Sequence, residues 1–119
     1  MTKVAIIDDE VQILGMIEKF LRKDPEFSVV TYSNPVTALS SISNDVDVVL
    51  LDIMMPEMNG LDVLEKLTEK YPDIKIIMMT AYSTLDKVLS AHRHGAVDYI
   101  MKPFSSMNVI TDKIESMVK

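Results

Sequence analysis

Short aliphatic runs alternate along the chain with stretches that have apolar residues at helical spacing. Strands covered by helices on both faces are continuously apolar, and most of the runs have this character. The five runs are 3–7, 27–32, 48–52, 74–79 and 96–101. Each is followed by a helical pattern, so the sequence predicts five strand–helix units in a single α/β domain over residues 1–119. The polar and apolar alternation of 27–32 favours an edge strand.

Local signals mark several predicted helix boundaries. Asn34-Pro35 supplies an N-cap and a first-turn proline for a short helix that ends near Ser43. Asn59-Gly60 begins a helix that ends near Tyr71-Pro72. A further helix over 83–94 ends in a cationic turn before a glycine, which explains its two histidines without a metal ion.

The first predicted helix, about Val11 to Lys23, has a wider apolar stripe than packing against a sheet requires. The stripe contains Ile13, Leu14, Ile17, Phe20 and Leu21, with Met16 at its margin. A broad core face and a docking surface for a protein partner both fit this width, and the pattern favours neither. Capping of this helix is an alternative role for Asp8 or Asp9, which stand just before it.

Composition excludes several classes of protein. With 119 residues the chain fits one compact domain, and its formal net charge of -6 argues against a surface that binds nucleic acid. The absence of cysteine excludes disulfides, a thiolate zinc site and a thiol nucleophile. No apolar stretch approaches the roughly 20 residues of a membrane span, and the first residues form a strand pattern instead of a signal peptide. We therefore expect a soluble cytoplasmic protein.

Polar side chains stand where the predicted strands end. Asp8 and Asp9 follow the first strand, Asp52 ends the third, Thr80 follows the fourth and Lys102 follows the fifth. Right-handed crossovers return every strand of such a sheet in the same direction, so these five side chains would meet at its carboxyl edge. Ligands bind at that edge in open α/β sheets.

Three carboxylates in one cleft repel each other unless a proton or a cation relieves the repulsion. Oxygen ligands without a nearby histidine or cysteine favour Mg²⁺. Together with the hydroxyl of Thr80 and the ammonium of Lys102, such a metal would form a cradle for a phosphoryl group, with Asp52 as the central nucleophile. Taken singly, the first two aspartates are well explained as helix caps, and Lys102 as a solvated surface charge.

These positions carry a resemblance that covers the whole chain. They are the acidic pair Asp8-Asp9, Asp52 with the following MMPEMNG loop, Thr80-Ala81, and Tyr99 with Lys102-Pro103-Phe104. In this pattern the chain resembles the receiver domains of two-component response regulators, the CheY-like family. The resemblance implies a flavodoxin-like, doubly wound sheet of five parallel strands in the order 2-1-3-4-5. It implies a phosphorylation-controlled signalling switch and not an enzyme.

The resemblance assigns roles to the site residues. It implies that Asp52 accepts a phosphoryl group from a phosphohistidine on a sensor histidine kinase or a phosphotransfer protein. Mg²⁺ would be bound by Asp9, Asp52 and the backbone carbonyl of Met54, with Asp8 acting through a water molecule.

The resemblance also implies how the signal leaves the site. Thr80 and Lys102 would hold the phosphoryl oxygens, and Thr80 would move toward the phosphate. The ring of Tyr99 would then turn inward and change the face formed by the fourth helix, the fifth strand and the fifth helix. That face would contact a downstream target or an output domain, or form a phosphorylation-dependent dimer. From the residues alone, Tyr99 is better explained as an ordinary half-buried strand tyrosine.

Three further positions carry expectations from the family. Met54 and Tyr82 lie two residues past the phosphoacceptor and Thr80, where family members vary. Neither side chain can orient an attacking water well, so slow self-dephosphorylation is expected, although Met54 could simply fill a gap in the packing. The bond before Pro103 is expected to be cis, which would aim Lys102 into the site, whereas trans is the general default.

Other functions compete with this interpretation. A receiver excised from a longer transcriptional regulator, with a DNA-binding or AAA+ output, fits the stretch 79–104 as well as a stand-alone receiver does. A Mg²⁺-dependent aspartyl-phosphate hydrolase would carry a second acid two residues after its nucleophile, where this chain has Met54. A flavodoxin-like cofactor binder would have a phosphate loop after the first strand, where this chain has three acids. A degenerate receiver that serves only for docking fits poorly, because every expected site residue is present.

Overall fold

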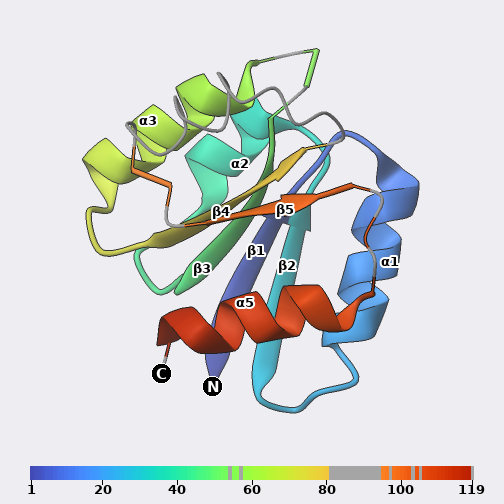
Figure 1. Ribbon diagram of the computed structural model, residues 1–119. Coiled ribbons are helices and arrows are strands. Elements are labelled where there is room, and N and C mark those ends of the chain that lie inside the picture. The colour runs from blue at the N-terminus through green and yellow to red at the C-terminus, as the bar shows by residue number, and fades with distance from the viewer. Residues whose placement is uncertain are drawn as a thin grey trace.

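The computed structural model describes residues 1–53, 55–56, 58–80, 95–96, 98–102, 104 and 106–118. In this part of the chain five parallel strands form one sheet in the order β2-β1-β3-β4-β5 (Figure 1). The strands are β1 (Thr2–Ile7), β2 (Phe27–Tyr32), β3 (Val48–Asp52), β4 (Lys75–Thr80) and β5 (Asp98–Met101). The predicted α/β class, the parallel sheet and its strand order are confirmed, and 27–32 is an edge strand as expected.

Four helices connect or follow these strands in the described part of the chain. They are α1 (Val11–Leu21), α2 (Pro35–Ser41), α3 (Gly60–Lys70) and α5 (Asn108–Val118). Within the described ranges, none of the helices has the length and apolar character needed to cross a membrane. The helix predicted over 83–94 lies outside the described residues, as do Met54, Tyr82 and Pro103.

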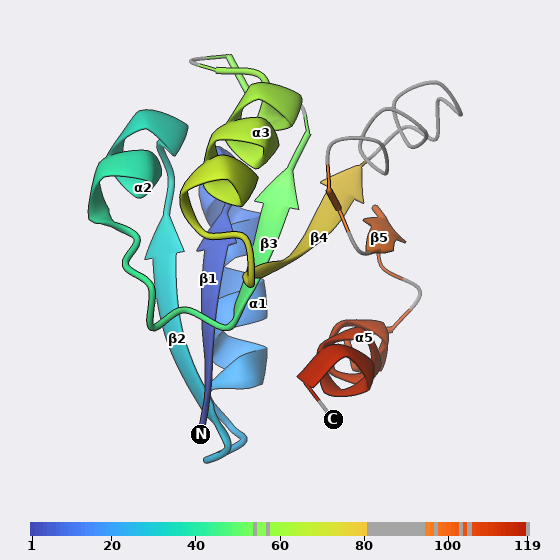
Figure 2. The same ribbon diagram turned by 90° about the vertical axis from the view of Figure 1, so that its left-hand side faces the viewer.

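The helices cover both faces of the sheet, with α2 and α3 on one face and α1 and α5 on the other (Figure 2). Successive side chains of a strand point to opposite faces, so the central strands contribute to two separate cores. Ile7, Leu51 and Met78 belong to the core under α2 and α3, whereas Ile6 and Leu50 belong to the core under α1 and α5. β3 is buried along its whole length, which explains why its sequence is an unbroken aliphatic run.

Two of the predicted helix starts are confirmed by their capping bonds. The Asn34 side chain accepts hydrogen bonds from the backbone N–H of Val36 at 2.8 Å and of Thr37 at 3.4 Å, at the start of α2. At the start of α3, Asn59 accepts one from Leu61 at 2.8 Å. Each bond satisfies a backbone donor that has no partner within its own helix.

The predicted cap of α1 is wrong. The N-cap position is Glu10, whose side chain makes no capping bond, and neither Asp8 nor Asp9 occupies that position. Asp8 Oδ1 instead accepts a hydrogen bond from the backbone N–H of Glu10 at 2.9 Å, just before the helix. The difference arises because Asp8 still belongs to the end of the β1 ladder, where its N–H bonds the carbonyl of Tyr32 at 3.1 Å.

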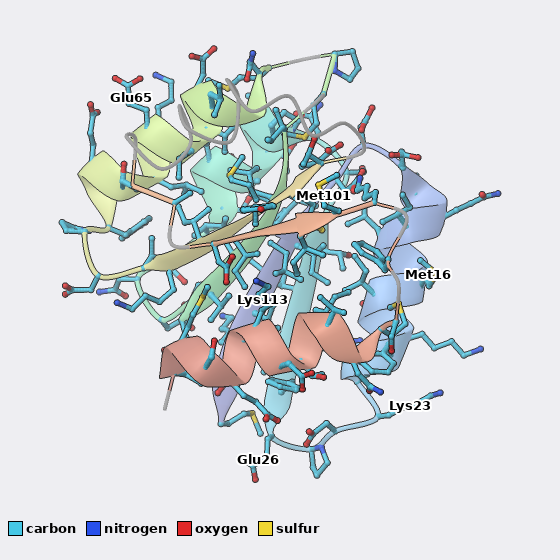
Figure 3. The ribbon with its side chains drawn as sticks, in the orientation of Figure 1. Met16, Lys23, Glu26, Glu65, Met101 and Lys113 are labelled. Carbon is cyan, nitrogen blue, oxygen red and sulfur yellow. The ribbon has the colours of Figure 1, made fainter. Side chains whose placement is uncertain are left out.

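The wide apolar stripe of α1 is mostly core. Leu14, Ile17 and Leu21 are buried, and Ile13 and Phe20 are half-buried against the same core. Met16 is 46% exposed and lies on the outer side of the helix (Figure 3). Burial therefore accounts for the stripe apart from its margin, and Met16 is left on the surface.

Candidate functional site

The buried polar and charged side chains of the described residues gather at one edge of the sheet. Asp8 follows β1, Asp52 ends β3, Thr80 ends β4 and Lys102 follows β5. Their exposed fractions are 0%, 3%, 1% and 6% respectively. Polar groups are rarely buried unless they are paired or functional, so their confinement to this edge marks it as the site.

The backbone holds these side chains in place by extending the strand ladders beyond the strands themselves. The N–H of Lys102 donates to the carbonyl of Thr80 at 2.7 Å, which prolongs the pairing of β4 with β5. Directly after Asp52, the N–H of Ile53 donates to the carbonyl of Met79 at 3.1 Å, which prolongs the pairing of β3 with β4. The side chains therefore project from rigid strand ends.

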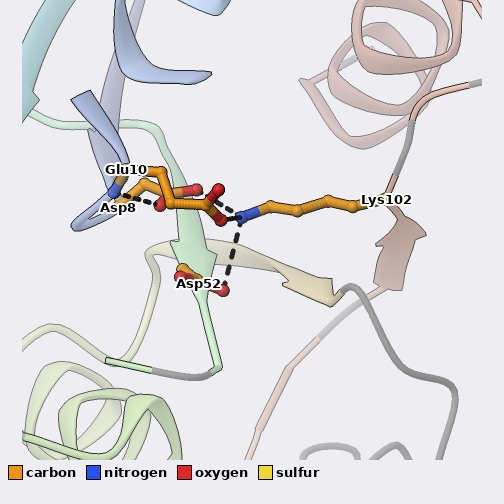
Figure 4. Close-up of polar contacts among 4 residues, drawn as sticks. All are labelled: Asp8, Glu10, Asp52 and Lys102. Atoms are coloured by element: carbon orange, nitrogen blue, oxygen red, sulfur yellow. Dashed lines mark hydrogen bonds and ion pairs between the residues drawn. The ribbon is translucent and has the colours of Figure 1, made fainter. Parts of the chain in front are cut away.

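Lys102 reaches across this edge to the carboxylates (Figure 4). Its Nζ lies 2.5 Å from Asp8 Oδ2, 3.3 Å from Glu10 Oε1 and 3.5 Å from Asp52 Oδ1. Burial alone would lower the pKa of the Lys102 ammonium, because a charge is poorly solvated in the interior. The hydrogen bond to Asp8 and the charges of Asp52, Asp8 and Glu10 outweigh this effect and raise the pKa above its ordinary value. Lys102 is therefore held as a cation.

Three carboxylates lie close enough to share one cation. Asp8, Glu10 and Asp52 each offer an oxygen, and these oxygens lie within 4.8 Å of one another. A cluster made only of carboxylate oxygens suits a hard cation such as Mg²⁺. The residues present therefore fit the metal that the sequence predicts, although one of its expected ligands, the carbonyl of Met54, lies outside the described residues.

The membership of this cluster differs in one residue from the expectation. Asp9, expected as a direct ligand, is half-buried and is not part of the group, whereas Glu10 is. The sequence shows three consecutive acids after β1, and the alternation of side chains along a strand no longer applies once the strand has ended. The run of acids is the only sequence signal that points to Glu10, and it does not distinguish the three.

Gly60 brings the loop after β3 back against the strand end. Its N–H donates to the carbonyl of Ile53 at 2.9 Å. A Cβ at this position would lie 2.6 Å from the Ile53 Cα and would collide with the backbone oxygen of Asp52. Glycine is therefore required by close approach of two backbone segments, one of which carries Asp52.

The two residues predicted to form a switch lie on neighbouring strands. Thr80 is buried at the end of β4, and Tyr99 on β5 is 41% exposed and aligned in register with Met78. Ile100, between Tyr99 and Met101, points into the core under α1 and α5. Tyr99 and Met101 thus point to the face of the edge strand β5 that is opposite this core.

Comparison with known proteins identifies the family. A family model described as the response regulator receiver domain matches residues 4–115. The chain belongs to this family. Receiver domains are signalling switches and not classical enzymes, and they bind Mg²⁺ at an acidic pocket. The family therefore implies phosphorylation-dependent signalling.

A curated relative supports the assignment to this family. It is 36% identical over 110 residues to the response regulator SaeR of Staphylococcus aureus, a match that covers 92% of the chain and 48% of SaeR. The chain thus spans about half the length of this curated relative.

Solved receiver domains have the same fold. The BeF3-activated receiver domain of DrrB, a Thermotoga maritima protein, superposes with a TM-score of 0.90 at 27% identity, over 99% of this chain and 97% of that one. The response regulator TrrA of Thermotoga maritima, solved in complex with Mg²⁺ and BeF, has a TM-score of 0.84 at 31% identity, over 98% and 99%.

Proposed function

We propose that this receiver domain accepts a phosphoryl group on Asp52 from a phosphohistidine, in a reaction that depends on Mg²⁺. The observation that carries the proposal is the position of Asp52, buried at the end of the central strand β3, with its Oδ1 at 3.5 Å from the ammonium of Lys102. A carboxylate in such surroundings is a suitable phosphoryl acceptor. The ammonium of Lys102 stands where the oxygens of a phosphoryl group on Asp52 would carry negative charge.

In the proposed reaction an oxygen of Asp52 attacks the phosphorus of the donor. The new P–O bond forms as the P–N bond breaks, and the electron pair of that bond returns to the imidazole. Lys102 and Thr80 are proposed to hold the phosphoryl oxygens. Asp9, Asp52 and the carbonyl of Met54, with Asp8 acting through water, would hold Mg²⁺, which would supply a charge that offsets the negative charge of these oxygens.

The change at the site is proposed to reach the surface through β4 and β5. Thr80 would move toward the phosphoryl group, and the exposed ring of Tyr99 would turn inward, changing the face formed by the predicted helix 83–94, β5 and α5. Lys113 on α5 already contacts Asp98 on β5 at 2.9 Å, so the two elements are joined by an ion pair. The changed face would contact a target or an output domain, or form a phosphorylation-dependent dimer.

The donor, the lifetime and the setting of the switch remain predictions. A sensor histidine kinase or a phosphotransfer protein would be the donor, in the cytoplasm, with no direct contact to nucleic acid or membrane. Slow self-dephosphorylation follows from Met54 and Tyr82. A DNA-binding or AAA+ output in a longer regulator is the alternative to a stand-alone receiver, and an aspartyl-phosphate hydrolase is less well supported.

The proposal is tested with beryllofluoride, a small phosphoryl analogue, in the presence of Mg²⁺. We expect the wild type to show amide NMR shifts at Asp52, Thr80 and Tyr99, and Asp52→Asn to show none. Both proteins must have the same spectrum dispersion before the analogue is added, so that a loss of folding is not read as a loss of binding. A wild type without shifts at Thr80 and Tyr99 would refute the switch.

A further inference from the structure

Glu10 lies at the mouth of the site, and beyond its place in the carboxylate cluster it has no assigned role in the switch. Its side chain is 56% exposed, whereas those of Lys102 and Asp8 are 5% and 0% exposed. Its Oε1 nevertheless lies 3.3 Å from the Lys102 Nζ (Figure 4). Glu10 is thus the solvent-facing partner of a cation whose other partners are buried.

The backbone of Glu10 is held by two hydrogen bonds, whereas its side chain does not cap the helix that follows. The N–H donates to Asp8 Oδ1 at 2.9 Å, and the carbonyl accepts from the N–H of Leu14 at 3.0 Å. The side chain makes no capping bond to α1. A residue whose backbone is held in this way, and whose carboxylate makes no capping bond, can act on the neighbouring site through its contact with Lys102.

We propose that Glu10 is a positioning residue that holds the ammonium of Lys102 toward Asp8 and away from a phosphoryl group on Asp52. The inference rests on the proposed function. The distances support it, because the Lys102 Nζ is nearer to Asp8 and Glu10 than to Asp52, at 2.5 and 3.3 Å against 3.5 Å. Glu10 also adds a third negative charge to the cluster.

Glu10 is expected to strengthen the binding of a cation at this site and to weaken the binding of an anion. Its charge attracts Mg²⁺ and repels an anionic phosphoryl analogue, and its contact with Lys102 withholds that cation from the anion. Glu10→Gln should therefore weaken Mg²⁺ binding by about tenfold and tighten beryllofluoride binding by about threefold, because in water a carboxylate a few ångströms away interacts by about 1 kcal/mol with a single charge and about twice as strongly with a divalent cation. Both changes should shrink at high ionic strength, because salt screens exposed charges.

The experiment measures two dissociation constants by amide NMR at constant ionic strength. The first is for Mg²⁺ alone, and the second is for beryllofluoride at saturating Mg²⁺. Glu10→Asp keeps the charge and should retain most of the wild-type behaviour. Glu26→Gln makes the same change of charge at an exposed residue next to the start of β1, at the opposite edge of the sheet, and should change neither constant.

Opposite shifts in Glu10→Gln, reduced at high salt and absent in Glu26→Gln, would support the inference. A loss of both affinities would indicate a damaged site and would overturn it, as would constants equal to those of the wild type. Only the role of Glu10 fails if the wild type binds Mg²⁺ and beryllofluoride while Glu10→Gln either loses both affinities or keeps both wild-type constants. If the wild type binds neither, the proposed function fails and the inference fails with it.

Discussion

The ammonium of Lys102 lies 2.5 Å from Asp8 Oδ2, although 94 positions separate the two residues in the sequence. The contact joins the end of β1 to the end of β5, with β3 and β4 between them in the sheet. One buried cation therefore offsets the charges of carboxylates from two strands, Asp8 and Asp52. This arrangement makes the site a part of the fold as well as a place for chemistry.

Removal of the buried cation should destabilise the protein in the absence of Mg²⁺. Lys102→Met leaves Asp8 and Asp52 without their common partner, and an uncompensated buried charge costs about 3 kcal/mol or more. The cluster is open to water on the side of Glu10, whose side chain is 56% exposed, and water reduces this cost. We therefore expect a loss of about 1–3 kcal/mol in the free energy of unfolding by urea.

The matched control for this variant is Lys113→Met. Lys113 also pairs with an aspartate at 2.9 Å, but both side chains are about one third exposed, at 34% and 29%. Such pairs contribute about 1 kcal/mol at most. If Lys113→Met costs as much stability as Lys102→Met, burial of the Lys102 cluster has no special weight and this account is wrong.

The stability contributed by Lys102 should disappear at alkaline pH. The pKa of its ammonium is raised in the folded protein above the ordinary value of 10.5. The contribution is therefore fully present below pH 10.5 and is lost as the pH rises through the folded pKa. We expect the difference in stability between the wild type and Lys102→Met to be constant near neutral pH and to shrink above pH 10.5. A difference that grows with pH would contradict the assignment.

The close approach at Gly60 predicts a large effect of a single methyl group. Gly60→Ala forces a Cβ against the backbone of Asp52 and Ile53, and we expect it to cost about 2 kcal/mol or more and to weaken binding at Asp52. In contrast, a Cβ at Gly15 meets nothing within 4 Å, and Gly15→Ala in the exposed part of α1 should stabilise by about 0.5–1 kcal/mol. Urea denaturation of the two variants tests this, and similar effects would refute the steric argument.

The sequence predicts the fold and the strand-end residues of the site better than it predicts the residues of the loops. The sheet and Asp52 were predictable because β3 is buried on both faces, so that an acid after its aliphatic run is conspicuous. The placement of Lys102 at the same edge followed from the parallel strand order. Neither Glu10 nor the steric role of Gly60 was predictable in this way, because both depend on how irregular loops approach a strand end in space.

Helix faces were predicted less completely than the strands. The helical spacing of Leu61, Leu64 and Leu67 predicts that these leucines form the inward face of α3, and the structure buries Leu64 and Leu67 but leaves Leu61 half-buried. Val63 is buried as well, although it was not expected. α3 packs against both the sheet and α2, so its buried face is broader than the spacing of the leucines indicates.

Exposure of Met16 predicts a contact with the phosphodonor protein. We expect Met16→Ala to slow phosphotransfer from the cognate kinase severalfold while leaving the rate with a small phosphodonor unchanged, because only the kinase would dock on α1. Val36 on α2 is also exposed, at 57%, and Val36→Ala on the opposite side of the sheet should change neither rate. Unchanged kinase transfer in Met16→Ala would remove α1 from the docking surface.

The central claim is that Asp52 is the acceptor, and the most direct measurement is the intact mass after incubation with Mg²⁺ and acetyl phosphate. The wild type and Asp112→Asn, which alters an exposed acid on α5, should each gain the mass of one phosphoryl group. Asp52→Asn should gain none, and omission of Mg²⁺ should abolish the gain in the wild type. A phosphoryl group on Asp52→Asn, or none on the wild type, would contradict the account.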